Sequence, residues 1–347
     1  MPQTESPKNN DNRYIAYWLL GVCALIFCMV VLGGVTRLTR SGLSMVDWQP
    51  IMGVIPPLNQ QEWQSTFEKY QQYPEYRHVN KDMSLDEFKS IFYFEYTHRL
   101  LGRLIGLAFL LPFLYFLLRG KIRRSLIPQL VTMFLLGGLQ GLLGWYMVKS
   151  GLIHEPRVSQ YRLTAHLGAA MLIFGYMLWT ALSLLHPEPV NRQTPGIGKL
   201  HRFSLAITAL IIVMILSGGF VAGTRAGYIL NTFPLMYGQF IPPGMYTMQP
   251  FYLNWFENLI SVQFNHRMIA YLLLLTIPTF WFVARRYSLA NRSRRIINLL
   301  GLMLIVQVTL GITTLIYIVP VALGAAHQGG ALVLLTLALM VNHELRS

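Results

Sequence analysis

Apolar residues fall in eight long blocks along the chain, separated by shorter polar stretches. A helix that crosses a bilayer needs about 20 mainly apolar residues, and each block is long enough. The pattern therefore predicts an all-α integral membrane protein with eight transmembrane helices. The expected spans are residues 14–36, 91–118, 126–148, 163–185, 200–222, 258–283, 296–318 and 322–342.

The composition agrees with a membrane protein. Of the 347 residues, 54% are hydrophobic and 12% are charged, whereas soluble domains carry about 25% charged residues. These values exclude a soluble enzyme, a disordered chain and a disulfide-stabilised secreted domain. The net charge of +14 could indicate nucleic-acid binding, but the basic residues lie in short loops between apolar blocks. We therefore expect a lipid bilayer, and no nucleic acid, as a partner.

The basic residues also predict the orientation of the chain. The loops after the second, fourth and sixth spans carry twelve lysines and arginines within residues 119–124, 192–202 and 285–295, whereas the opposite short loops carry four. The positive-inside rule therefore places both termini in the cytoplasm. The first block has no small-residue cleavage site after it, and the N-terminal tail does not resemble a transit peptide. We expect a bacterial inner membrane.

The first outer loop, residues 37–90, is the longest. Residues 59–73 predict a short interfacial helix. Ser84 and Glu87 form an S-x-x-E capping box that would begin the helix of the second span. The chain has two cysteines, Cys23 and Cys28, which would point about 140° apart on a helix. We expect neither a disulfide nor a thiolate metal site.

The two halves of the chain repeat the same short motifs in the same order. The repeat predicts two tandem, parallel units of four helices, residues 1–190 and 191–347. The matching pairs are Thr36-Arg37 with Thr224-Arg225, His98-Arg99 with His266-Arg267, Gln140 and Gly144 with Gln307 and Gly311, and His166-Leu167-Gly168 with His327-Gln328-Gly329. The helix starts Ser84/Glu87 and Asn254/Glu257 also correspond.

Four of the nine histidines, His98, His166, His266 and His327, lie in the outer parts of the even-numbered spans. Ionisable groups inside a membrane are costly and usually face a bundle interior. The repeat groups the four as two pairs, and paired imidazoles on facing helices are typical of bis-histidine haem ligation. Zinc usually takes three or four ligands, and each half offers two. A paired-histidine proton relay is the other alternative.

Neighbouring residues fit a haem site. Glycines would give a flat macrocycle room, although they could equally serve helix packing; they are Gly102, Gly106, Gly168, Gly175, Gly329 and Gly330. Arginines on the same side could bind haem propionates or reach lipid phosphates; they are Arg37, Arg99, Arg225 and Arg267.

One residue distinguishes the halves. Glu95 stands three residues before His98, and Gln263 stands three residues before His266, each on the same helix face as its histidine. A carboxylate beside a metal site can take protons or stabilise positive charge, or simply orient the histidine. We expect the first half to carry the chemistry and the second to hold a permanent cofactor.

These residues resemble the motifs of the haem A synthase family. The matching segments are Glu95-Tyr96-Thr97-His98-Arg99, His166-Leu167-Gly168, Asn265-His266-Arg267, Ala326-His327-Gln328-Gly329-Gly330, Gly33-Gly34-Val35-Thr36-Arg37, Gly42-Leu43-Ser44, Trp48 and Pro50. The resemblance covers about residues 20–343. It implies an enzyme that oxidises the C8 methyl group of haem O to a formyl group by successive hydroxylations, giving haem A for terminal oxidases.

The resemblance also implies roles for the histidines. His98 and His166 would flank the iron of haem O or haem A, and His266 and His327 would ligate haem b. Glu95 matches the family's essential outer-side glutamate. Some members carry a cysteine pair in the first outer loop, but residues 37–90 contain no cysteine, so the chain resembles the cysteine-lacking proteobacterial and mitochondrial subgroup.

Two other functions stay open from the residues alone. A di-haem electron-transfer cytochrome would not need Glu95 and would normally hold its haems at different depths. A repeat transporter would place its site near the midplane with broken helices, and no such pair is evident. The expected partners are haem O, a redox partner and the farnesyltransferase that makes haem O. A homo-oligomer, in which a second copy of the chain is the partner, is a further expectation.

Overall fold

The computed structural model describes residues 7–46, 54–152 and 157–346. In these ranges the regular elements are helices, and eight of them are long and apolar enough to cross a membrane. They are α1 (Pro7–Leu38), α4 (Leu85–Leu118), α5 (Ile127–Gly151), α6 (Gln160–Leu185), α7 (Ile197–Thr224), α8 (Leu259–Ala284), α9 (Asn291–Ile316) and α10 (Val321–Leu345). The chain is an all-α, multi-pass membrane protein, as the apolar pattern predicted.

Each expected span lies on one of these helices. The largest differences are at the starts of α1 and α4, which begin several residues before the apolar blocks. Polar first turns extend both helices there, and hydropathy alone does not report them. The capping box of α4 is confirmed, because the Ser84 side chain accepts from the Glu87 backbone and the Glu87 carboxylate accepts from the Ser84 backbone.

The motif Asn254/Glu257, expected to begin α8, does not cap this helix. This helix begins at Leu259, and its cap is Asn258, whose side chain accepts from the backbone N–H groups of Ile260 and Ser261. Asn254 lies in the short helix η3 (Phe251–Trp255) and donates to the backbone oxygens of Met248 and Phe251. An Asn side chain can close a loop as readily as cap a helix, and the sequence motif does not separate the two uses.

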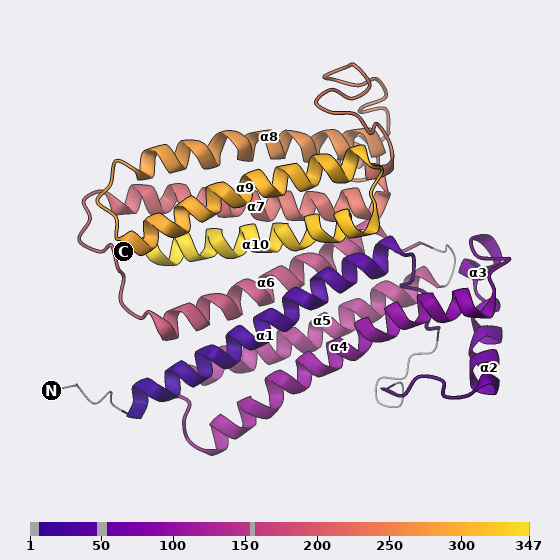
Figure 1. The fold of residues 1–347 in the computed structure, drawn as a ribbon, viewed down its shortest axis with the longest axis horizontal. Helices are drawn as coiled ribbons and strands as arrows, with labels where there is room; N and C mark the ends of the chain where they lie inside the picture. The colour runs from indigo at the N-terminus through magenta and orange to yellow at the C-terminus, as the bar shows by residue number, and fades with distance from the viewer. Residues whose placement is uncertain (1–6, 47–53, 153–156, 347) are drawn as a thin grey trace.

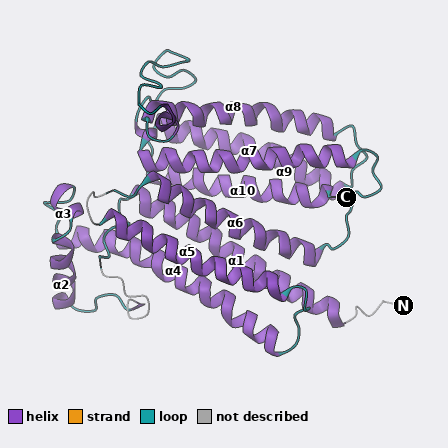
Figure 2. Cartoon of the chain, turned by 180° about the vertical axis from the view of Figure 1, so that it is seen from behind, coloured by secondary structure: helices purple, strands orange, loops and turns teal. Residues whose placement is uncertain are grey.

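The helices form an elongated bundle with both termini at one end (Figure 1). We call the opposite end the distal end. It carries α2 (Gln60–Gln71), α3 (Pro74–His78), η2 (Ala226–Tyr228), η3 and the loop between α7 and α8 (Figures 1 and 2). The helix predicted over residues 59–73 is therefore confirmed as α2, and its Asn59 side chain caps it.

Four helices make the centre of the bundle. α1, α6, α7 and α10 pack against one another, α4 and α5 lie on one side of them, and α8 and α9 lie on the other (Figure 1). In the first half, α1 and α5 each pack against both α4 and α6. In the second half, α7 and α9 each pack against both α8 and α10. α4 and α6 therefore occupy opposite corners of one group, and α8 and α10 occupy opposite corners of the other.

The two cysteines face different ways on α1. Cys23 is buried, Cys28 is exposed, and both are free thiols. The expected absence of a bond between them follows from this helical geometry.

Candidate haem-ligand pairs

The four intramembrane histidines lie on the corner helices, each in the half of its helix nearer the distal end. His98 is on α4 and His166 on α6, and these two rings are close enough to interact electrostatically. His266 on α8 and His327 on α10 form a second pair of the same kind. The structure thus brings together the pairs that the repeat predicted, across the middle of each four-helix group.

Each histidine ring lies against one glycine of a neighbouring helix. A Cβ placed on Gly33 would lie 3.1 Å from the Cε1 atom of His98. One placed on Gly144 would lie 3.0 Å from the Cε1 atom of His166. In the second half, a Cβ on Gly218 would lie 3.4 Å from the Cε1 atom of His266, and one on Gly311 would lie 2.9 Å from the Cε1 atom of His327. These four glycines leave the room that the rings occupy.

The glycines singled out from the sequence have a different role, with one exception. Gly102, Gly168, Gly175, Gly329 and Gly330 contact side chains of neighbouring helices, which is the helix-packing alternative. Gly106 has open space beside it. Gly33, Gly144 and Gly311 were visible in the sequence only as repeat matches or motif members, and Gly218 was not singled out, because a sequence does not report which helices become neighbours.

The hydrogen bonds to the ring nitrogens differ between the two pairs. The Nδ1 atom of His266 is 3.1 Å from the Ser217 hydroxyl, and that of His327 is 3.2 Å from the Gln307 amide. The Nδ1 atoms of His98 and His166 are buried without a hydrogen-bond partner among the described residues. In the first pair the Nε2 atom of His166 lies 3.5 Å from the Gln140 amide, so the two pairs differ in which ring nitrogen has a polar partner.

Glu95 does not orient His98. Its carboxylate is buried and accepts from the Ser44 hydroxyl at 2.7 Å, the Met45 backbone N–H at 2.8 Å and the Arg99 guanidinium at 2.6 Å. His98 is not among the hydrogen-bond partners found for Glu95 in the described part of the chain. The carboxylate instead ties α4 to the first turns of the distal loop after α1.

The second half makes the same tie without a carboxylate. The Gln263 amide donates to the backbone oxygens of Ala226 and Ile229, and its oxygen accepts from Arg267 at 3.0 Å. Arg267 also donates to the backbone oxygens of Leu230 and Thr232, as Arg99 donates to that of Met45. The halves therefore share a clamp on the loop after their first helix, and they differ by one buried negative charge.

Arg37 and Arg225 lie where the two halves meet. Arg37, at the end of α1, donates to the backbone oxygen of Ala222 near the end of α7 at 2.9 Å. Burial lowers the pKa of Arg225, and the nearby Arg40 and Arg157 lower it further. These guanidiniums form a strongly positive region at the distal end, between the two histidine pairs.

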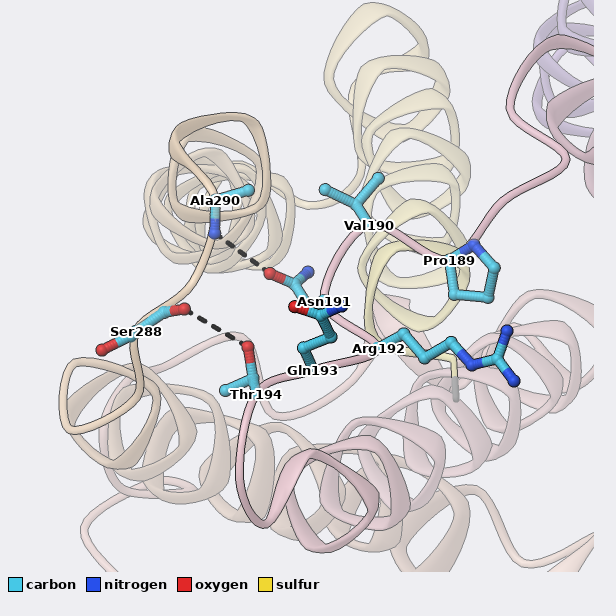
Figure 3. A pocket seen from close by; sticks show the side chains of 8 residues that line it. All are labelled: Pro189, Val190, Asn191, Arg192, Gln193, Thr194, Ser288 and Ala290. Atoms are coloured by element: carbon cyan, nitrogen blue, oxygen red, sulfur yellow. Dashed lines mark hydrogen bonds between the residues drawn. The ribbon is translucent and has the colours of Figure 1, made fainter.

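Other predicted features lie elsewhere. Trp48, Pro50 and His154 are outside the described residues. A surface pocket lies at the end that carries the termini, between the α6–α7 and α8–α9 connections, where Asn191 accepts from the backbone N–H of Ala290 (Figure 3). This pocket is far along the bundle from the histidines. The described residues contain no cluster of three or more His, Cys, Asp or Glu side chains that could hold a metal ion.

Comparison with known proteins agrees with the motif resemblance. Residues 16–339 match the family described as cytochrome oxidase assembly protein, COX15-CtaA. The chain is similar to a heme A synthase of Nitrosospira multiformis, with 55% identity over all of this chain and 97% of the relative. It is 47% identical to the heme A synthase COX15 of Arabidopsis thaliana, over 96% of this chain and 75% of the relative.

Another relative, a heme A synthase of Nitrosomonas eutropha, is 53% identical over 99% of this chain and 98% of its own length. Matches of this extent cover both histidine pairs, the distal loops and the clamp residues together. The chain belongs to the haem A synthase family of cytochrome oxidase assembly proteins.

Proposed function

We propose that this protein oxidises the C8 methyl group of haem O to a formyl group by successive hydroxylations, which makes it a haem A synthase. The observation that carries this proposal is the match to haem A synthases along nearly the whole chain. The two histidine pairs supply places for two haem groups in the membrane. A di-haem electron-transfer cytochrome is not favoured by these matches.

The C-terminal unit, residues 191–347, holds haem b between His266 and His327. Two imidazoles on opposite helices fit bis-histidine ligation, and the donor set offers no third ligand that would suit zinc. Ser217 and Gln307 orient the two rings, as expected for a resident cofactor. Haem b, when bound, supplies a redox-active iron.

The N-terminal unit, residues 1–190, receives haem O between His98 and His166. Gly106 on α4 and Gly137, Gly138 and Gly141 on α5 are exposed, and a Cβ added at any of them would meet no atom within 4 Å. Counted from the paired histidines and glutamines, the second half has Leu274, Leu304, Ile305 and Val308 at these positions. The first half therefore has glycines where the second half has bulkier side chains, which supports a site in the first half for a haem that carries a long isoprenoid tail.

Glu95 serves the reaction in the first half. With water as the oxygen source and the redox partner as electron acceptor, conversion of a methyl to a formyl group (R–CH3 + H2O → R–CHO + 4 H⁺ + 4 e⁻) releases protons, and a buried carboxylate near the reacting haem can accept them. Ser44 and Met45 hold this carboxylate, and Arg99 balances its charge. Gln263 cannot accept a proton in the same way, which fits a second site that holds a cofactor without reaction.

Four arginines bind haem propionates in this proposal: Arg37, Arg99, Arg225 and Arg267. The support is their position at the distal end near both histidine pairs. The Nε atoms of Arg37 and Arg267 are buried without a hydrogen-bond partner among the described residues. The contacts already made by Arg99 and Arg267 mean that these two would serve the loop clamp and the propionates together.

The protein lies in a bacterial inner membrane with both termini in the cytoplasm, so that the distal end and the histidine pairs face the periplasm. The loop charges support this orientation. Haem O arrives from the farnesyltransferase that makes it, and a redox partner removes electrons.

The direct test is to purify the protein and identify its extracted haems by chromatography and mass. We expect haem b together with haem O, haem A or a hydroxylated intermediate. Haem b alone, with no conversion of added haem O, would instead establish the electron-transfer cytochrome.

Replacement of Glu95 by Gln tests the division of roles. Glu95→Gln keeps the size of the side chain, and its amide oxygen can still accept from Arg99, although its NH2 group then faces the Met45 N–H. Haem content should be retained while product formation falls at least tenfold. The matched control is Asp86→Asn, an exposed carboxylate on the same helix. Normal turnover of Glu95→Gln would remove this residue from the mechanism.

A further inference from the structure

The loop between α7 and α8 is free of charge over an unusual length. Residues 226–256 contain no Asp, Glu, Lys, Arg or His. By contrast, the other long distal loop, residues 37–90, carries many acidic and basic residues. A long loop exposed only to water has no reason to exclude every charged residue.

This loop lies beside the first half of α8 as well as beyond its distal end. The Leu230 and Thr232 carbonyls accept from Arg267, and the Pro234 carbonyl accepts from the Tyr271 hydroxyl at 3.3 Å. Tyr271 is twelve residues into α8, which is about 18 Å along a helix axis. In two opposite views the loop projects sideways past α8 near its distal end (Figures 1 and 2). Part of the loop therefore lies at the same depth along the bundle axis as the first turns of α8.

The side chains on the projecting part are large, apolar and exposed. Exposed fractions reach 58% for Phe240, 66% for Ile241 and 61% for Tyr252. Tyr237, Phe251 and Trp255 are exposed as well. The first distal loop does the opposite, because its aromatic residues Trp63, Phe67 and Tyr70 are buried against Phe88 and Phe92 of α4.

The loop holds these side chains in fixed positions. Three asparagine side chains donate to backbone oxygens of its turns: Asn231 to Gly227, Asn254 to Met248 and Asn258 to Gly244. Backbone groups at a membrane surface need such partners, since hydrocarbon offers none. The exposed aromatics are thus presented on an ordered framework.

We infer that residues 229–256, here called the aromatic loop, bind the lipid bilayer in the leaflet at the distal end. Tyrosine and tryptophan are typical of the membrane–water interface, where their rings sit at the level of the head groups. The exposed surface continues directly onto the lipid-facing side of α8, where Leu272 and Leu275 are exposed. The loop is therefore a lateral membrane anchor joined to the helix that carries His266.

The test places a fluorescent label on the loop in vesicles of phosphatidylethanolamine and phosphatidylglycerol. The background variant Cys28→Ala removes the exposed thiol, since Cys23 is buried. Labels go on Phe240→Cys and on Tyr252→Cys, with Ser65→Cys on the exposed side of α2 as the matched control. Only preparations with the haem content of the unlabelled parent are compared.

We expect acyl-chain spin-labelled lipid to quench the labels at positions 240 and 252 several-fold more than the label at 65. Iodide in the water should show the reverse order. Iodide quenching at 240 and 252 equal to that at 65 would overturn the inference. Protection from both quenchers would also overturn it, because a protein, such as a second copy of the chain, would then cover the loop.

Discussion

Gly311 and His327 show at the residue scale how closely the ligand positions are fitted. Neighbouring helices touch the rings at glycines, and a single added methyl group would enter the space of the imidazole. The sequence could identify the histidines and pair them, because intramembrane histidines are rare and the repeat orders them. It could not identify Gly33 or Gly218 as ring contacts, or Ser44 as a partner of Glu95, because these contacts join separate helices and loops.

Gly311→Ala should reduce bound haem b. The new Cβ would lie 2.9 Å from the His327 Cε1 atom, so the ring must turn, and the nitrogen that we propose as a haem ligand must move with it. The measurement is the ratio of haem b to protein after purification. Gly301→Ala on the same helix is the control, because open space surrounds that position. Equal haem content in both variants would show that His327 is not a ligand.

At the scale of elements, helix starts were predictable where one local motif specifies them. The Ser84–Glu87 capping box begins α4 as expected, because all its atoms lie within four residues. The capping residue of α8 was misassigned, because Asn254 and Asn258 both follow the same local preference and loop contacts decide between them. The packing of α2 and α3 onto α4 also depends on distant residues, and the sequence alone gave no sign of the buried Glu75.

The docking of α3 should depend on pH through Glu75. Burial and then the nearby Glu95 raise the pKa of this carboxyl to about 8, while Arg225, Arg40 and the Tyr70 hydrogen bond act in the opposite direction. The folded loop therefore binds the proton more tightly than the unfolded chain, whose carboxyl has an ordinary pKa near 4.5. Docking should be strongest at low pH and weaken as the pH rises from about 5 through 8.

Hydrogen exchange of residues 60–80 between pH 5 and 9, corrected for the intrinsic exchange rate, measures this dependence. Glu75→Gln should remove most of it, since the amide is neutral throughout. Glu68→Gln, at an exposed position in α2, should leave it unchanged. A protection profile that is flat with pH in the unmodified protein would contradict the argument.

On the scale of the whole molecule, the centre of the bundle was the least predictable feature. All eight spans are strongly apolar, so hydropathy does not rank them by position. The structure places α1, α6, α7 and α10 together because small residues allow close approach. A Cβ on Gly223 of α7 would lie 2.5 Å from the Gln160 Cβ on α6, and one on Gly219 would lie 2.8 Å from the Thr164 hydroxyl.

Gly223→Ala should therefore weaken the contact between the halves. The added methyl group meets the Gln160 backbone as well as its side chain, so the helices must separate. Overpacking of this kind typically costs about 1–3 kcal/mol, and thermal unfolding in detergent should occur at a lower temperature. Gly198→Ala on the same helix has open space and serves as control. Equal unfolding temperatures for the two variants would show that the contact contributes little.

The adjacent glycines of α1 have a consequence for how the protein can be altered. Gly33 lies against His98 of one pair, while Gly34 lies against Gln328, the residue after His327 of the other pair, and Gln328 donates to the Val30 backbone oxygen at 2.8 Å. One turn of helix thus borders both sites. A change in this turn therefore acts on both sites, whereas a change in α5 or α9, which each border a single histidine pair, can act on one proposed haem site alone.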